Sequence, residues 1–378
     1  MDLQELRTAI DDIDTQMTDL FCKRMEISAQ VAQHKKAQGI KVLDRTRERE
    51  ILTRVGKQAG EPLDMYARML YSVLFDLSRS YQETFFDGET PLTRNIRQAM
   101  ERSGQFPRRG TIACQGVEGA YSQMACDKLF TMPDIVYFRN FEGVFQAVEK
   151  GLCEFGVLPI ENSSNGSVSA VYDLMRRYHF HIVRSIRMHI DHNLLVKPGV
   201  KLADIKEIIS HEQALGQCSD FLNSHPEIKV VICENTAAAK LVAESDRRDI
   251  AALSSGNCAL LYGLEALPEH VQNSENNYTR FICIAKEMAI YPGADRISLM
   301  LSVEHTPGAL YRMIARFATL GLNLTKLESR PIVGRDFEFL FYFDFEASVW
   351  SQDVIRLLGE CSARDQLFVF LGSYSEVR

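Results

Sequence analysis

Apolar residues recur in a heptad pattern along the N-terminal part of the chain. They are Leu3, Leu6, Ile10, Ile13, Met17, Leu20, Ile27 and Val31. This spacing predicts one long helix that packs against partner helices and ends near Gly39. Asp44 and Thr46 can start a second helix, and Gly60-Glu61-Pro62 would end it. A third helix is expected from about Leu63 to Phe86.

Position 24 belongs to the apolar face of the first helix, yet it is Arg24. A buried charge costs several kcal/mol unless an anion meets it. Lys35 follows eleven residues later, three turns plus about 20° around the helix, and so lies on nearly the same face. Two cations with no acid between them on this face suggest a pocket for a small carboxylate ligand. The alternative is that both side chains extend to water, as long basic side chains often do.

The pattern changes after a polar linker that contains Pro107. Short runs rich in β-branched residues alternate with helical stretches, which predicts an α/β layer with largely parallel strands. The runs are 111–114, 135–138, 155–160, 207–209, 230–233 and 250–253, and the helical stretches include 141–150 and 236–243. Residues 179–196 are expected to form an extended crossover between two lobes, with a ligand-binding cleft between them.

A third pattern begins near Arg296. Strands are expected at 297–304, 322–330, 337–345 and 367–372, and helices at 307–320 and 350–361. This βαββαβ order is the ferredoxin-like motif, and Gly334-Arg335 would form the tight turn between its middle strands.

Composition excludes several classes of protein. With 43 Lys+Arg against 50 Asp+Glu and no long basic run, a nucleic-acid-binding surface is not expected. No stretch approaches the roughly 18 apolar residues of a membrane span, and no signal-peptide core is found. Nine cysteines lie far apart without a C-x-x-C pair, which indicates reduced thiols in the cytoplasm and no structural zinc.

Further polar residues join Arg24 and Lys35 in the helical region. The set is Arg7, Asp44, Arg47, Glu48, Ser78 and Gln82. Each alone suits a solvated surface, but their order and spacing resemble the helical chorismate mutase module: L-R-x-x-I-D-x-x-D near Arg7, D-R-x-R-E at 44–48 and S-x-x-x-Q at 78–82.

The resemblance implies a Claisen rearrangement of chorismate, in which no proton moves and no covalent adduct forms. Catalysis then means holding a compact conformer and stabilising charge on the ether oxygen. The family roles fall on this chain as follows. Arg7, Arg24, Lys35 and Arg47 bind carboxylates, Lys35 and Gln82 donate to the ether oxygen, Asp44 and Glu48 hold the ring hydroxyl, and Ser78 lines the site. In the family, Arg7 reaches the site of a partner subunit in an interlocked dimer.

The α/β region carries five segments rich in hydroxyl and amide groups, at 116–122, 159–167, 210–218, 234–238 and 276–281. Each is expected to follow a strand at a helix N-terminus, where backbone N–H groups favour anions. N-capping is the simpler interpretation of any one of them alone. Together they resemble prephenate dehydratase over about residues 110–287, and Asn277-Tyr278-Thr279-Arg280-Phe281 is the most specific mark.

Prephenate loses its ring hydroxyl and a carboxylate together, driven by aromatisation. An acid beside the hydroxyl is enough, so no metal or cofactor is implied. The resemblance puts Thr279 at that hydroxyl and makes substrate-binding residues of Asn162, Ser210, His211, Gln217, Thr236 and Arg280. His211 is expected to position rather than to donate a proton, because it starts a helix. Val117 and Glu212 stand where the family usually has proline, which predicts an altered loop shape or regulation.

The last region resembles the ACT regulatory domain attached to such dehydratases, through Thr306-Pro307-Gly308-Ala309-Leu310 and Leu327-Glu328-Ser329-Arg330-Pro331. The resemblance implies that phenylalanine binds there, at Gly308, Ala309, Leu310, Glu328, Ser329 and Arg330. A plain ferredoxin-like lid is the alternative. A chain cut after about Met288 is expected to turn over prephenate without responding to phenylalanine.

The three resemblances occur in the order of the bifunctional chorismate mutase/prephenate dehydratase family. They imply an all-α helical mutase domain at 1–88, a linker at 89–109, a two-lobed α/β (periplasmic-binding-protein-like) dehydratase domain at 110–288 and an α+β ferredoxin-like ACT domain at 296–378. Chorismate and prephenate would be the substrates, and phenylalanine the effector. A homodimer or higher homo-oligomer is expected, with no nucleic-acid or membrane partner.

Three other interpretations compete with this one. A dehydratase could retain the helical module only for dimerisation, but a scaffold would favour apolar residues in place of Arg24 and Lys35. A two-lobed binding module would keep the cleft without needing Thr279. A DNA-binding regulator is disfavoured by the charge of the chain.

Overall fold

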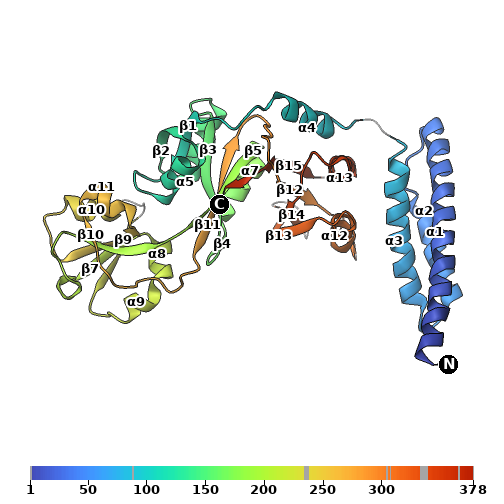
Figure 1. Ribbon diagram of the computed structural model, residues 1–378, viewed down its shortest axis with the longest axis horizontal. Coiled ribbons are helices and arrows are strands. Elements are labelled where there is room, and N and C mark those ends of the chain that lie inside the picture. Colours follow the sequence, from blue (N-terminus) through green and yellow to red (C-terminus); the bar gives the residue numbers. More distant parts are fainter. Residues whose placement is uncertain are drawn as a thin grey trace. The chain divides into compact units, whose positions relative to one another are not determined.

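The computed structural model (Figure 1) describes residues 2–86, 89–233, 238–303, 305–306, 308–332, 339–364 and 367–377. The chain divides into two compact units. The first comprises Met1–Arg94, Val303–Gly321 and Ile355–Asp365, and the second comprises Asn95–Ser302, Leu322–Val354 and Gln366–Arg378. Among the described residues, no helix has the length and apolarity needed to cross a bilayer.

The N-terminal region consists of three helices, as predicted: α1 (Leu3–Gln38), α2 (Arg45–Ala59) and α3 (Asp64–Glu83). Asp2 and Glu5 form a capping box at the start of α1, and Gly39 ends it with φ of 66°, a left-handed conformation that glycine adopts without steric cost. Asp44 caps α2 by accepting a hydrogen bond from the Arg47 backbone N–H at 3.0 Å. In Figure 1, α1 and α3 run alongside each other.

Within its compact unit, the heptad face of α1 is left uncovered by the residues that the structure describes. All eight of its apolar residues, from Leu3 to Val31, are between 39% and 66% exposed. The buried residues of α1 are Ser28 and Ala32 instead. A face of this length that no described element of its own compact unit covers suits burial against another helical surface.

The second unit contains two α/β lobes. In the first, a mixed sheet has the order β16-β5-β11-β3-β1-β2, with β4 paired to β3. The strands are β1 (Arg109–Gln115), β2 (Met132–Phe138), β3 (Phe155–Asn162), β4 (Gly166–Ser167), β5 (His181–His189), β11 (Tyr278–Ala285) and β16 (Glu376–Val377). The helices of this region are α4 (Pro91–Arg102), α5 (Tyr121–Leu129), α6 (Phe141–Glu149) and α7 (Ser169–Tyr178).

The second lobe is built on a sheet of order β10-β6-β9-β7-β8. Its strands are β6 (His192–Val196), β7 (Glu207–Ser210), β8 (Lys229–Ile232), β9 (Ile250–Ser255) and β10 (Glu265–Ala266). Its helices are the 3-10 helix η1 (Leu202–Asp204), α8 (Glu212–Gln217), α9 (Ser219–Asn223), α10 (Ala238–Glu244) and α11 (Asn257–Tyr262). The predicted crossover at 179–196 is confirmed, because it forms β5 in one sheet and β6 in the other.

The expectation of largely parallel strands holds only for part of each sheet. β1 pairs in parallel with β2 and β3, and β7 pairs in parallel with β8 and β9. By contrast, β11 is antiparallel to both β3 and β5. The return of the chain from the second lobe inserts β11 between strands of the first sheet, and the sequence pattern did not predict this strand.

The C-terminal region has the predicted βαββαβ order: β12 (Arg296–Ser302), α12 (Ala309–Thr319), β13 (Asn323–Pro331), β14 (Phe339–Glu346), α13 (Gln352–Arg364) and β15 (Phe368–Tyr374). Its sheet is antiparallel, with the order β13-β14-β12-β15. The predicted turn at Gly334-Arg335 lies outside the described residues.

This sheet shares a core with the first α/β lobe. Met300, Leu340 and Tyr342 belong to the same buried cluster as Leu158 and Tyr172, and the rings of Tyr172 and Tyr342 meet edge to face at 4.5 Å. The last strand, β16, pairs with β5. A cut after Met288 would remove these contacts and expose core residues, so the structure disagrees with the expectation of a separable C-terminal module.

Candidate functional sites

Arg24 turns toward α3 rather than toward water. Its guanidinium donates to the Ser78 hydroxyl and, at 3.4 Å, to the Leu74 carbonyl oxygen. It also lies 5.9 Å from the centre of the Phe75 ring. Burial lowers the pKa of Arg24, which indicates that the cation is partly desolvated before any anion reaches it. A carboxylate beside it would therefore be bound more strongly than at an exposed arginine.

Gln82 lies one turn beyond Ser78 on α3. Both side chains are buried, and the Gln82 Oε1 has no hydrogen-bond partner among the described residues. A buried amide with an unmet acceptor costs free energy. Gln82 is thus a polar group that a bound ligand or water can complete.

The remaining predicted residues of this region lie around the start of α2. The Lys35 ammonium donates to the Val42 carbonyl oxygen at 2.6 Å, and Glu48 forms an ion pair with Arg79 of α3. The Arg47 guanidinium pairs with Glu50 at 3.2 Å, and both side chains are exposed. Arg79, which sequence reasoning did not single out, follows Ser78 directly and fixes the position of Glu48.

Arg7 is exposed and lies apart from this group. It precedes Arg24 by 17 residues, and at 1.5 Å per residue the two are about 25 Å apart along α1. No side chain spans that distance, so Arg7 cannot join the site of its own chain.

A cavity of about 570 Å³ lies in the second unit, and side chains from both α/β lobes line it. Asn162 at the end of β3 and Thr279 in β11 come from the first lobe. From the second lobe come His192 of β6, His211, which is the N-cap of α8, and Gln217 of α8. The sequence-predicted cleft is therefore present, and four of the residues predicted for it line it: Asn162, His211, Gln217 and Thr279.

Asn162 holds the Thr279 hydroxyl in a defined orientation. The Asn162 Oδ1 accepts hydrogen bonds from the backbone N–H groups of Ser164 and Asn165, at 3.0 and 2.9 Å. The amide nitrogen must therefore face the other way, where Nδ2 donates to the Thr279 Oγ1 at 2.9 Å and to the Asn277 Oδ1 at 2.8 Å. Because the Thr279 oxygen already accepts, its own O–H is available to donate elsewhere.

His192 extends this network, and sequence reasoning missed it. Its Nε2 lies 2.8 Å from the Gln217 Oε1, which also accepts from the Asn277 Nδ2 at 3.0 Å. Burial lowers the pKa of His192 and outweighs the opposing effects of Gln217 and Asp191, so the imidazole is neutral near pH 7 and donates through Nε2. The only signal in the sequence was a lone histidine at the start of an apolar strand.

Two residues predicted for the cleft, Ser210 and Arg280, are not among the described residues that line it. Ser210 is buried and donates to the Leu253 carbonyl oxygen at 2.6 Å, so its hydroxyl is used within the second lobe. Thr236 lies outside the described residues. Arg280 lines a different cavity, because successive side chains of a strand point to opposite faces and Thr279 takes the cleft side.

The 276–281 segment also lies in a different type of element from the one predicted. It was expected after a strand at a helix N-terminus, but Tyr278 opens β11 in the interior of the sheet. For His211 the prediction holds: it is the N-cap of α8, where its Nδ1 accepts from the Gln213 backbone N–H at 3.3 Å.

The residues predicted to bind phenylalanine divide between two faces of β13 and the start of α12. Gly308 has φ of 75° and precedes α12, which Ala309 and Leu310 begin. Glu328 binds the Ser167 hydroxyl, and Arg330 binds the Ser169 hydroxyl. Ser329, on the other face of β13, is exposed. Glu328 and Arg330 are thus already used in contacts to the first α/β lobe.

Comparisons with known families match both regions. The family Chorismate mutase type II matches residues 6–83, and the family Prephenate dehydratase matches residues 112–289. The bifunctional chorismate mutase/prephenate dehydratase of Escherichia coli (strain K12) is 30% identical, over 98% of this chain and 96% of that protein. Arogenate dehydratase/prephenate dehydratase 1 of Arabidopsis thaliana is 38% identical, over 75% of this chain and 76% of its own length.

A solved structure of a prephenate dehydratase is also similar to this chain. Prephenate dehydratase from Arthrobacter aurescens in complex with L-Phe has 28% sequence identity and a TM-score of 0.63. The match covers 70% of this chain and 89% of that chain.

Proposed function

The chain belongs to the bifunctional chorismate mutase/prephenate dehydratase family, and from this membership we propose which of its residues carry the two reactions. It converts chorismate to prephenate and prephenate to phenylpyruvate. The observation that supports the assignment most is the fixed Thr279 hydroxyl, which accepts from Asn162 at 2.9 Å and keeps its proton for the cleft.

In the mutase reaction, the helical site binds chorismate as a compact conformer. Arg24 grips a carboxylate beside Ser78, and Lys35 and Gln82 donate toward the ether oxygen as its bond breaks. Asp44 and Glu48 hold the ring hydroxyl, with Arg79 fixing Glu48. The burial of Gln82 one turn beyond Ser78 on α3 supports this assignment, because a side-chain amide held in place before the substrate binds is a preorganised donor.

A second copy of the chain completes the mutase site. The exposed heptad face of α1 suits burial against the same face of a second copy, and Arg7 cannot reach its own Arg24. In a homodimer built on α1, Arg7 of one copy lies over the pocket of the other and binds a carboxylate there, as Arg47 does from α2.

In the dehydratase reaction, Thr279 donates a hydrogen bond to the ring hydroxyl of prephenate. The ring C–O bond and the bond to the ring carboxylate break, and the electrons of the latter enter the ring. The departing hydroxide takes the proton of the Thr279 hydroxyl, which solvent then replaces, so water and carbon dioxide leave and the ring of phenylpyruvate is aromatic. Asn162, Gln217 and His192 keep the donor aimed, and His211 lines the substrate cavity.

The C-terminal βαββαβ region is an ACT domain at about 296–378, following a dehydratase domain at about 110–288, a linker at 89–109 and a mutase domain at 1–88. Phenylalanine binds this domain and inhibits the dehydratase, as the L-Phe complex of the Arthrobacter aurescens protein suggests for its relative. Glu328 and Arg330 already bind Ser167 and Ser169. The predicted residues that remain for phenylalanine are Gly308, Ala309, Leu310 and Ser329.

Glu212 favours arogenate as a second substrate. Glu212 is one of the residues that line the cleft, and arogenate carries an ammonium group where prephenate has a keto oxygen. An exposed pair of this kind contributes up to about 1 kcal/mol, or about fivefold in a ratio of rates. We expect E212Q to lower the ratio of arogenate to prephenate turnover by up to about fivefold, measured as kcat/KM on each substrate. An unchanged ratio would remove Glu212 from substrate selection.

The assignment is tested by supplying chorismate to the purified chain and following prephenate and phenylpyruvate together. Prephenate should rise first and phenylpyruvate should follow. Formation of phenylpyruvate from supplied prephenate, without any turnover of chorismate, would instead support a helical module that serves only dimerisation.

A further inference from the structure

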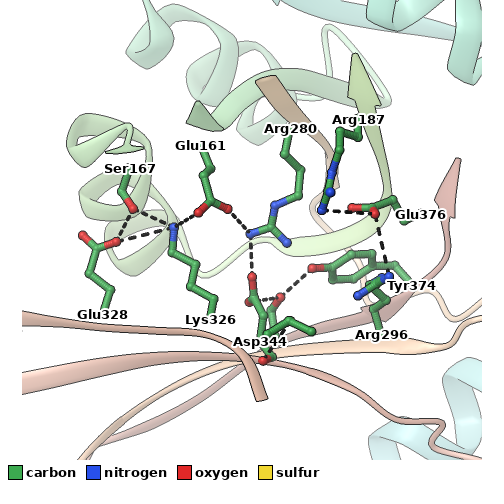
Figure 2. A network of polar contacts seen from close by, with 12 residues as sticks. Glu161, Ser167, Arg187, Arg280, Arg296, Lys326, Glu328, Asp344, Tyr374 and Glu376 are labelled. Atoms are coloured by element: carbon green, nitrogen blue, oxygen red, sulfur yellow. Dashed lines mark hydrogen bonds and ion pairs between the residues drawn. The ribbon is translucent and has the colours of Figure 1, made fainter. Parts of the chain in front are cut away.

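Arg280 lies directly after the proposed hydrogen-bond donor Thr279, but on the other face of β11. There it lines a cavity of about 470 Å³ together with residues of the C-terminal sheet. Its side chain is only 10% exposed. A charged side chain buried to this extent needs anionic partners, and Figure 2 shows it between two carboxylates.

The two carboxylates come from different sheets. The Arg280 Nη2 lies 2.5 Å from the Asp344 Oδ2 on β14 and 3.3 Å from the Glu161 Oε2 on β3. The other Asp344 oxygen accepts from the Ser298 hydroxyl at 2.5 Å, and Ser298 in turn lies 2.6 Å from the Tyr374 hydroxyl. Asp344 is thereby anchored in the C-terminal sheet while it holds a strand of the dehydratase sheet.

The register of β3 and β11 links this ion pair to the cleft. Thr279 lies opposite Asn162, and Arg280 lies opposite Glu161. The cleft pair and the ion pair are therefore neighbouring cross-strand pairs with side chains on opposite faces. The next step along β11 places Phe281 opposite Pro159, which marks a bulge. A β-bulge redirects side chains and disrupts the regular hydrogen bonds between the strands. Side-chain contacts therefore contribute more to fixing the strand register at this point.

A neighbouring strand of the C-terminal sheet holds the other side of the same lobe. The Lys326 ammonium on β13 lies 3.1 Å from the Glu161 Oε1 and 2.6 Å from the Ser167 Oγ. Glu328 of the same strand also binds Ser167 (Figure 2). Asn162 ends β3 and Ser167 lies five residues later in β4, so the C-terminal sheet contacts both chain segments that carry the cleft hydrogen bond.

We propose that Arg280 is a positioning residue of the dehydratase, which transmits the state of the C-terminal sheet to the Thr279–Asn162 pair through its ion pair with Asp344. The proposal rests on the proposed roles of Thr279 and of phenylalanine. A displacement of β14 moves Asp344, and the buried guanidinium follows its carboxylate. That shifts Thr279, the adjacent residue of the same strand, relative to Asn162.

The test measures prephenate turnover with and without saturating phenylalanine, and phenylalanine binding by calorimetry, on the full chain. D344N should still bind phenylalanine saturably, but the inhibition should fall by at least about fivefold, the lower end of typical allosteric coupling. R280Q should lower kcat with little change in KM, and R280K should recover most of the lost rate because it retains a cation beside Asp344.

E346Q is the matched control. Glu346 lies two residues from Asp344 on β14 and lines the same cavity, but it pairs with Arg296 and Asn323 of the C-terminal sheet itself. It should retain both the rate and the response. Mutase turnover of each variant reports whether the chain is folded. If D344N loses mutase turnover as well, R280Q/D344N takes its place, because removing both charges leaves no unpaired partner between them.

Full inhibition of D344N by phenylalanine would overturn the proposal, and so would an equal loss in E346Q. If the wild-type chain does not bind phenylalanine, the proposed effector is refuted. The role of Arg280 is then tested by the turnover rates of its variants on prephenate. In that case a loss of kcat in R280Q that R280K recovers supports the positioning role, and unchanged rates in R280Q refute it.

Discussion

Asn162→Asp tests the orientation of the Thr279 hydroxyl most sharply. The substitution keeps the shape of the side chain and the oxygen that accepts from the Ser164 and Asn165 backbone. It replaces the Nδ2 donor, which lies 2.9 Å from the Thr279 Oγ1, by a carboxylate oxygen. The Thr279 O–H then turns to that oxygen and is withdrawn from the substrate.

The expected fall in kcat follows from the loss of the Thr279 O–H as a donor to the substrate. A positioned proton or hydrogen-bond donor contributes typically about 10²–10⁴-fold to a rate, so kcat on prephenate should fall at least about 10²-fold. The new oxygen also faces the Asn277 Oδ1 at the position of a 2.8 Å hydrogen bond. An unsatisfied buried polar group costs about 1–3 kcal/mol, so the thermal unfolding midpoint should fall without loss of the fold.

The assay is phenylpyruvate formation from supplied prephenate, with mutase turnover of the same preparation as the check on folding. Asn165→Asp is the matched control, because it adds the same charge to the same loop at an exposed position without facing Thr279. Retention of kcat within about threefold in Asn162→Asp would refute the orientation argument. An equal loss in Asn165→Asp would refute it as well, by attributing the effect to charge alone.

Two further predictions concern the mutase site and the buried histidine. Arg24→Ala should lower mutase turnover by at least about 10²-fold, the usual cost of one preorganised donor, while prephenate turnover stays within a few-fold; intact mutase kinetics would contradict the role of Arg24. For His192, burial lowers the pKa in the folded chain, below the value of about 6.5 expected when unfolded. The unfolded chain then binds a proton that the folded chain does not, so stability is lost as the pH falls below about 6.5. His192→Gln should flatten the fall of the unfolding midpoint between about pH 6.5 and 5, and an unchanged slope would contradict this.

The helical region was predictable almost to the residue, because its signals are local. Gly39 and Gly60 end helices, Asp44 caps one, and the heptad pattern identifies the exposed face of α1. The position of Arg24 in that pattern was enough to single it out before any neighbour was known.

The cleft was predictable only in part, because its parts depend on pairing between distant strands. The 276–281 segment carries polar residues next to an apolar run, and this pattern predicts a segment that follows a strand at a helix N-terminus. Its strand character, and hence the opposite faces of Thr279 and Arg280, follows from pairing with β3, which lies more than a hundred residues away. His192 could not be predicted for the same reason, because Gln217 becomes its hydrogen-bond partner only after the second lobe has folded.

The most direct test of the central claim is a progress curve with chorismate as the only substrate added to the Thr279→Val chain. The account predicts that prephenate accumulates at the wild-type mutase rate and that phenylpyruvate formation falls at least about 10²-fold, with substantial recovery in Thr279→Ser. Phenylpyruvate formation at the wild-type rate by the valine variant would contradict it, because the shape of residue 279 would then be enough without a hydroxyl.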